Sequence, residues 1–228
     1  MSQACPSVPP EPGRNLSYGD YILRTGRGII GAFELVFGAF LYQKFKGRSR
    51  IVDVGPGRCW FPKQNPQAII AVDNSPELVE YFSKQGIDIR LGDAYNLQLP
   101  DAYADGVLAC WLLEHLADPL RAMKEIYRVM QPGAYGMIIV PTPYDMNAFH
   151  EDYTHVRPYT ATSLKQLAED AGFVRHRETL LPYYPGATKV LKYFGPSVTL
   201  WYINFGDRFL RKLGLKNNNN IMLEVWKS

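Results

Sequence analysis

Short apolar runs alternate with stretches of helical spacing along most of this chain. Two helices have clear signals at their ends: Ser75-Pro76 begins one that ends near Gly86, and Asp118-Pro119 begins one that Pro132-Gly133 stops. A third helix covers 164–171. The predicted strands occupy 51–52, 68–72, 87–91, 106–110, 135–140, 173 onward and 221–226. This alternation predicts an α/β fold, a mostly parallel sheet with helices on both faces.

Two further segments have a helical hydrophobic period. Phe33, Val36, Phe37, Phe40 and Leu41 share one face, which predicts a helix packed on the core, with a lid over a ligand as the alternative. In the second segment, the aromatic face of 182–216, we expect core packing, with a substrate wall, a dimer contact or a membrane-surface contact as alternatives. Its members are Val198, Trp201, Tyr202, Phe205 and Phe209.

The domain organisation follows from these segments. We predict a disordered tail over 1–14, rich in proline and polar residues, and a single domain over 15–228. Within it, a helical cap covers 15–47 and a helical insertion, 182–216, precedes the last strand. Pro62 and Pro66 are expected to cut short the helix that normally follows the first strand.

The first strand runs into a glycine turn, Asp53-Val54-Gly55-Pro56-Gly57. Glycine permits positive φ and lets a ligand approach the backbone closely. Eighteen residues after Gly55, the next apolar run ends in Asp73, where an acid can bond both hydroxyls of a ribose. Trp60 occupies the place of the third glycine of dinucleotide-binding turns, which argues against NAD or FAD. The pattern predicts a nucleoside-binding crevice at the carboxyl ends of parallel strands.

Composition and charge limit the partners and the compartment that fit this chain. The formal net charge of +3 is too small to argue for nucleic acid. Three widely spaced cysteines fit neither a disulfide framework nor a zinc site, which favours a reducing, cytoplasmic compartment. No secretory signal is visible, and the longest apolar region, 28–42, is too short to span a bilayer. Peripheral contact with a membrane stays open, as does the choice between monomer and homodimer.

At this point the chain resembles the class I S-adenosylmethionine-dependent methyltransferases, in the small-molecule group related to quinone-biosynthesis enzymes. The resemblance runs from about 51 to 173. Five motifs carry it in order and at the right spacing: 51–57, Asp73, Gly92-Asp93-Ala94 with Leu99-Pro100, 105–119, and Arg128-Val129-Met130 with Pro132-Gly133. The resemblance implies a Rossmann-like seven-stranded sheet whose last strand is antiparallel.

The resemblance also implies a cofactor, S-adenosylmethionine, and the residues that bind it. Gly55 and Gly57 would leave room for the methionine part, and Asp73 would hold the ribose. Asp93 and the Ala94 backbone would meet the adenine, and Cys110 and Trp111 would lie near the sulfonium. The predicted cofactor site also includes Asp53 and Asn74.

The chain departs from the family pattern in two places. The common third glycine of the first motif is Cys59 here. The Glu-x-x-Glu-His metal motif of some quinone O-methyltransferases lacks its first Glu, because Trp111 stands there, so we predict no metal and interpret Glu114-His115 as a structural or cofactor-side pair. The variant around Cys59 is similar to methyltransferases associated with glycan and cell-envelope biosynthesis.

Candidate catalytic residues follow the fifth strand. His150, Asp152 and His155 lie at the carboxyl end of the sheet, where a general base for a hydroxyl acceptor belongs. We predict that His150 or His155 accepts the proton and that Asp152 orients the imidazole. Metal binding by these three residues, or ordinary turn capping, are the alternatives.

The sequence thus predicts a methyltransferase that acts on a small-molecule or glycan-like acceptor, at oxygen. An RNA methyltransferase is the second hypothesis, disfavoured by the weak charge and the lack of an RNA-binding module. A non-catalytic protein that binds S-adenosylmethionine is the third.

Overall fold

The computed structural model describes residues 17–24, 28–143, 149–150, 152–181, 184–213 and 220–228 of the 228-residue chain. The tail expected over 1–14 lies outside these residues. Within them, no helix is both long and apolar enough to cross a membrane.

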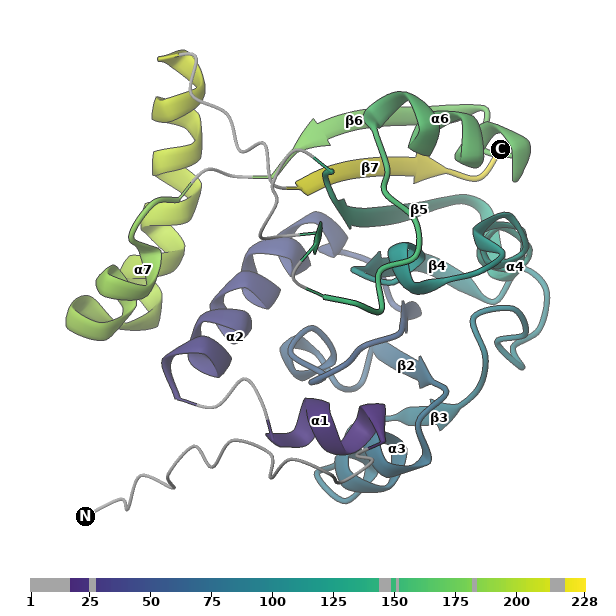
Figure 1. Ribbon diagram of the computed structural model, residues 1–228, viewed down its shortest axis with the longest axis horizontal. Helices are drawn as coiled ribbons and strands as arrows, with labels where there is room; N and C mark the ends of the chain where they lie inside the picture. The colour runs from purple at the N-terminus through teal and green to yellow at the C-terminus, as the bar shows by residue number, and fades with distance from the viewer. Residues whose placement is uncertain (1–16, 25–27, 144–148, 151, 182–183, 214–219) are drawn as a thin grey trace.

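The described strands form one seven-stranded sheet in the order β3-β2-β1-β4-β5-β7-β6 (Figure 1). All neighbouring pairs are parallel except those of β7, which runs antiparallel to both β5 and β6. The strands are β1 (Ile51–Val54), β2 (Ile69–Asp73), β3 (Ile89–Leu91), β4 (Ala104–Cys110), β5 (Met130–Pro141), β6 (Arg175–Leu180) and β7 (Asn220–Trp226). The prediction of a mostly parallel sheet with an antiparallel last strand is confirmed.

Helices cover both faces of this sheet, as predicted. On one face, Val52 and Val54 pack with Val107 against α4 and α6. On the other face, Ile51 and Leu108 pack against α2 and α7, while α3 covers β2 and β3. The helices are α1 (Tyr18–Arg24), α2 (Ile29–Tyr42), α3 (Pro76–Ser83), α4 (Pro119–Val129), α6 (Ala161–Asp170) and α7 (Ala187–Lys212). Successive strand residues therefore alternate between two apolar layers.

The local signals act as expected at the helix starts. The Ser75 hydroxyl accepts the Leu78 N–H at 3.3 Å and caps α3, and the Asp118 carboxylate accepts the Arg121 N–H at 3.1 Å and caps α4. After β1, a single 3₁₀ turn over Pro62–Gln64 stands where a longer helix is usual. The expected effect of the prolines is confirmed.

Two local expectations are wrong. The helix that we expected to reach Pro132 ends at Val129, because β5 already begins at Met130. Pairing with β4 then jumps from Ala104↔Met130 to Gly106↔Tyr135, so residues 131–134 form a bulge.

The second wrong expectation concerns α7. Four of the side chains that we expected in the core are exposed: Val198, Trp201, Phe205 and Phe209. The opposite side of α7 packs on the domain instead, through Leu191, Thr199 and Ile203. In contrast, the predicted core face of α2 is buried at Val36, Phe37, Phe40 and Leu41.

Candidate functional site

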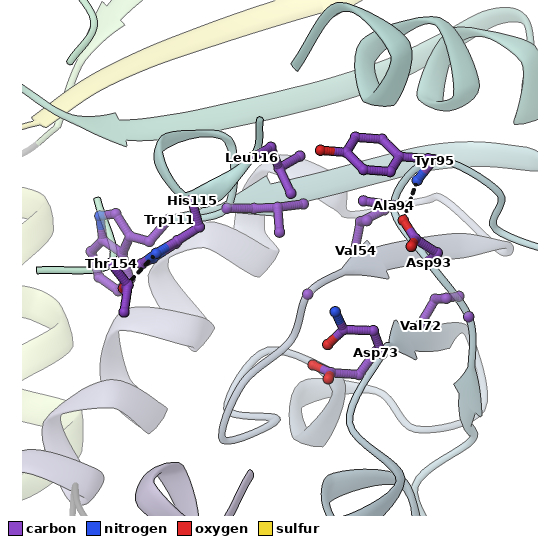
Figure 2. Close-up of a pocket in the computed structure, with 14 residues that line it drawn as sticks. Val54, Val72, Asp73, Asp93, Ala94, Tyr95, Trp111, His115, Leu116 and Thr154 are labelled. Atoms are coloured by element: carbon purple, nitrogen blue, oxygen red, sulfur yellow. Dashed lines mark hydrogen bonds between the residues drawn. The ribbon is translucent and has the colours of Figure 1, made fainter. Parts of the chain in front are cut away.

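A crevice opens at the carboxyl ends of β1, β2 and β4, beside the point where the strand order reverses. Its larger part has a volume of about 310 Å³, and a smaller part of about 110 Å³ shares Gly55 and Trp111 with it. The larger part is lined by Val54, Gly55, Val72, Asp73, Asn74, Gly92, Asp93, Ala94, Tyr95, Trp111, Leu112, His115, Leu116 and Thr154. Figure 2 shows Asp73 and Asp93 on one side of it and Trp111, His115 and Thr154 on the other.

All nine residues of the predicted cofactor site line one part or the other. Gly55, Asp73, Asn74, Asp93, Ala94 and Trp111 border the larger part, and Asp53, Gly57 and Cys110 border the smaller one. The two parts therefore bring together residues from the ends of four different strands, β1 to β4.

The glycine turn is shaped for close approach. Gly55 has φ of 68°, and a Cβ on it would lie 2.9 Å from a methyl carbon of Leu112. Gly57 also has positive φ, 52°, and so does Cys59, at 53°. A side chain at Gly55 would collide with the crevice wall, so this position needs glycine. Cys59 occupies the left-handed region at the place where the family commonly has its third glycine.

Asp73 sits at the tip of β2 with one oxygen engaged. The Ser75 N–H donates to Oδ1 at 2.9 Å. Burial raises the pKa of Asp73, whereas N–H groups of Ser75, Gly57 and Asn74 lower it. Burial, and then the charge of Asp73, raises the pKa of Asp53 well above its usual range. Asp73 is therefore the better placed of the two acids to accept hydrogen bonds from a diol.

Asp93 belongs to a tight turn after β3. The Tyr95 N–H donates to its Oδ1 at 2.8 Å, and backbone bonds join Asp93 to Asn96. The Tyr95 hydroxyl in turn accepts the Asp118 N–H at 3.1 Å. These bonds fix the turn, so that Ala94 and Tyr95 form a wall on the Asp93 side of the crevice (Figure 2).

Trp111 separates the two parts of the crevice. Its backbone is left-handed, with φ of 54°, a conformation that costs free energy in a bulky residue. Its indole N–H donates to Asn220 Oδ1 at 2.8 Å, and its ring stacks on Phe37 with centroids 5.7 Å apart. The contacts from β7 and α2 therefore hold the ring against the crevice.

The Trp111 side of the crevice ends in a chain of hydrogen bonds. Thr154 Oγ1 lies 2.6 Å from Asp152 Oδ1 and 2.9 Å from His115 Nδ1 (Figure 2). An ionised carboxylate only accepts hydrogen bonds, so the single hydroxyl hydrogen of Thr154 goes to Asp152. The Thr154 oxygen then accepts from His115 Nδ1–H. This arrangement leaves the lone pair of His115 on Nε2.

The charges in this chain agree with that assignment. Burial opposes ionisation of Asp152, but hydrogen bonds from Thr154 prevail and lower its pKa. Burial, and then the neighbouring His155, lower the pKa of His115 below its ordinary value of 6.5. His115 is therefore neutral at pH 7, with an unprotonated nitrogen available to take a proton.

The three predicted catalytic residues differ in their relation to the crevice. His150 is exposed and does not line the crevice. His155 packs edge-on against His115, with ring centroids 4.7 Å apart, and its Nδ1 donates to the Phe149 carbonyl at 2.8 Å. Asp152 reaches the crevice through Thr154. The sequence analysis singled out neither His115 as a base nor Thr154, although both line the crevice.

Glu114 is a buried carboxyl next to this chain. Neither of its oxygens has a hydrogen-bond partner among the described residues, and burial raises its pKa to about 8. Glu114, His115 and His155 offer one ligand atom each, all within 4.8 Å of one another, so this group could hold a metal ion. Our expectation of no metal stays a prediction.

Comparison with known proteins gives a family match in the same region. Residues 52–138 match the model of a methyltransferase domain. A solved S-adenosylmethionine-dependent methyltransferase from Archaeoglobus fulgidus is 25% identical, with a TM-score of 0.67, over 92% of this chain and 100% of that one.

Two curated relatives act on different acceptors. A tRNA (carboxymethyluridine(34)-5-O)-methyltransferase of Arabidopsis thaliana is 30% identical over 59% of this chain and 33% of the relative. A 2-methyl-6-phytyl-1,4-hydroquinone methyltransferase of Oryza sativa is 30% identical over 45% of this chain and 31% of the relative. The chain spans 60%, 36% and 35% of the length of three further relatives.

Proposed function

Since the chain carries a class I S-adenosylmethionine-dependent methyltransferase domain, we propose that it transfers the methyl group of this cofactor to a hydroxyl of a small-molecule or glycan-like acceptor. The observation that carries the proposal is one crevice whose two ends are lined by different chemical groups. A glycine turn and two strand-end acids form one end, and a neutral histidine on a hydrogen-bond chain forms the other.

The cofactor end fits a nucleoside with a methionine tail. Asp73 would hold the ribose hydroxyls, and Asp93 with Ala94 would border the adenine. The small part of the crevice, next to Gly55 and Gly57, would take the methionine tail, with Trp111 at the junction. S-adenosylmethionine supplies an electrophilic methyl group on a sulfonium.

The opposite end fits an acceptor hydroxyl. His115 Nε2 would take the hydroxyl proton while the acceptor oxygen replaces the sulfonium sulfur on the methyl carbon, so that the methyl–sulfur bond breaks and leaves its electron pair on sulfur. Thr154 and Asp152 would hold the imidazole in the required tautomer. Trp111 would exclude water from one side of the reacting groups. Of the histidines predicted from sequence, His155 keeps a part in this proposal, as the neighbour that lowers the pKa of His115.

Asp73→Ala should weaken binding of S-adenosylmethionine by about 1–3 kcal/mol, because charge-assisted hydrogen bonds to the ribose are lost. Isothermal titration calorimetry measures this, and we expect one cofactor per native chain. Asp88→Ala, at an exposed acid that pairs with Arg90, is the matched control. Native protein that binds no S-adenosylmethionine, or binds NAD more tightly, would contradict the proposal.

RNA is a second candidate acceptor, because one relative with 30% identity is a tRNA methyltransferase. A radiolabelled methyl transfer assay can compare bulk tRNA with hydroxylated small molecules and oligosaccharides. Label that enters only RNA would replace the small acceptor in the proposal.

We further propose a cytoplasmic location.

A further inference from the structure

The exposed face of α7 is unusually rich in aromatic residues. Trp201 and Phe205 stack with ring centroids 5.1 Å apart, and Phe205 stacks in turn on Phe209 with centroids 6.5 Å apart.

At about 100° per residue, positions four apart, such as 201 and 205, are separated by about 40° around the helix and so share one face. The ring planes of each stacked pair lie within 5° of parallel. Trp201, Phe205 and Phe209 are 61%, 55% and 53% exposed, so this face is a ladder of rings that the domain leaves uncovered.

Positive charge lies on the same face. Positions 201, 205, 208 and 212 follow one another at spacings of four, three and four, which places Arg208 and Lys212 in line with the rings. Both side chains are exposed. A hollow of about 370 Å³ is lined by Trp201, Asn204, Phe205 and Arg208, so a cation and two rings border one recess. Aromatic rings beside cations suit the boundary between lipid headgroups and acyl chains.

The charges of α7 indicate which kind of partner could cover this face. The part of α7 after its break at Gly195 contains three lysines or arginines and one acid, Asp207, whose position does not share the spacing of three or four that joins the rings and Arg208. In a two-fold dimer built on this face, Arg208 and Lys212 would approach their own copies without an acid on the face to pair with them. A negatively charged lipid surface complements the cations and the rings together.

We propose that the exposed face of α7 docks the protein on an anionic membrane surface. Leu191, Thr199 and Ile203 hold the opposite side of the helix on the domain, so docking needs no unfolding of α7. Figure 1 shows α7 at the side of the molecule, beyond α2. The proposal is independent of the methyl-transfer chemistry, because none of the face residues lines the crevice.

Flotation of the full chain with vesicles tests the proposal. We expect binding to mixed phosphatidylcholine–phosphatidylglycerol vesicles that weakens with salt, and much weaker binding to pure phosphatidylcholine. Each cation near an anionic surface contributes about fivefold, so the double variant Arg208→Gln/Lys212→Gln should bind about 25-fold more weakly. Trp201→Ala/Phe205→Ala should lose about tenfold or more, because less apolar surface enters the interface.

The matched controls are Lys124→Gln on α4 and Tyr81→Ala on α3, both at exposed positions. They should bind the vesicles as the native chain does. The proposal is overturned if the native chain stays unbound at low salt, or if the controls lose as much binding as the α7 variants. Light scattering that shows a dimer dissociated by Phe205→Ala would assign the face to a second copy of the chain instead.

Discussion

His115→Ala is expected to lower turnover by roughly 10²–10⁴-fold, the usual loss when a general base is removed. The reason is that His115 lines the crevice and that the Asp152–Thr154 chain leaves its lone pair on Nε2. Cofactor affinity should change little, because the glycine turn and Asp73 are untouched. Steady-state turnover, measured beside cofactor binding by calorimetry, separates the two effects.

The matched control is His150→Ala, which removes an exposed histidine and should leave turnover near native. Thr154→Val should lower turnover as well, because it breaks the chain that sets the tautomer of His115. Near-native turnover of His115→Ala would refute the base assignment. Loss of native activity on chelation, restored by a divalent metal, would assign Nε2 to a metal held with Glu114 and His155 instead.

The pH profile gives an independent readout of the same group. A base with a lowered pKa becomes unprotonated at lower pH, so the acid limb of kcat/KM should lie below pH 6.5. Asp152 raises the pKa of His115, because its negative charge favours the imidazolium. Asp152→Asn should therefore move the acid limb to still lower pH while reducing turnover. An acid limb at the same pH in Asp152→Asn as in the native protein would contradict this coupling between Asp152 and His115.

Glu114→Gln is expected to remove a large part of the loss of stability that accompanies a rise in pH from 4.5 to 8. The folded-state pKa of Glu114, about 8, exceeds its ordinary value of 4.5. Below pH 4.5 the carboxyl is protonated in both states, and stability is unaffected. Between pH 4.5 and 8 only the unfolded state releases the proton, so stability falls, by up to about 5 kcal/mol at pH 8.

Urea unfolding at a series of pH values from 4 to 8 measures this effect. The fall in the free energy of unfolding should be smaller in Glu114→Gln than in the native protein. Glu80→Gln, at an exposed residue paired with Lys84, is the control and should leave the profile almost unchanged. Native and Glu114→Gln profiles that run parallel would show that Glu114 ionises normally in the folded protein.

The alternation of strands and helices and the cofactor end of the crevice could be predicted from local features. Gly55, Asp73 and Asp93 each lie at or just after the end of a predicted strand, and parallel strands bring such positions to one edge of the sheet. The antiparallel direction of β7 came from the family resemblance, because hydrophobic spacing carries no information on strand direction.

The other end of the crevice could not be predicted in the same way. Thr154 contacts His115 across 39 positions of sequence, so their contact depends on tertiary packing that no local pattern encodes. The prediction that the apolar face of α7 packs in the core was wrong for a different reason. A helical stripe of apolar residues has the same period whether it faces the core or a partner, and only the tertiary packing of Leu191, Thr199 and Ile203 decides which side is buried.

The positions of the tryptophans give the protein two separate optical reporters. Of its four tryptophans, Trp111 borders the crevice, Trp60 lies beside it with ring centroids 6.1 Å apart, and Trp201 stands on the outer face of α7. A ligand in the crevice should quench the emission of the first pair, whereas transfer of Trp201 into an apolar interface should shift its emission to the blue. In a Trp201→Phe variant, the remaining change in emission would report the crevice without contribution from α7.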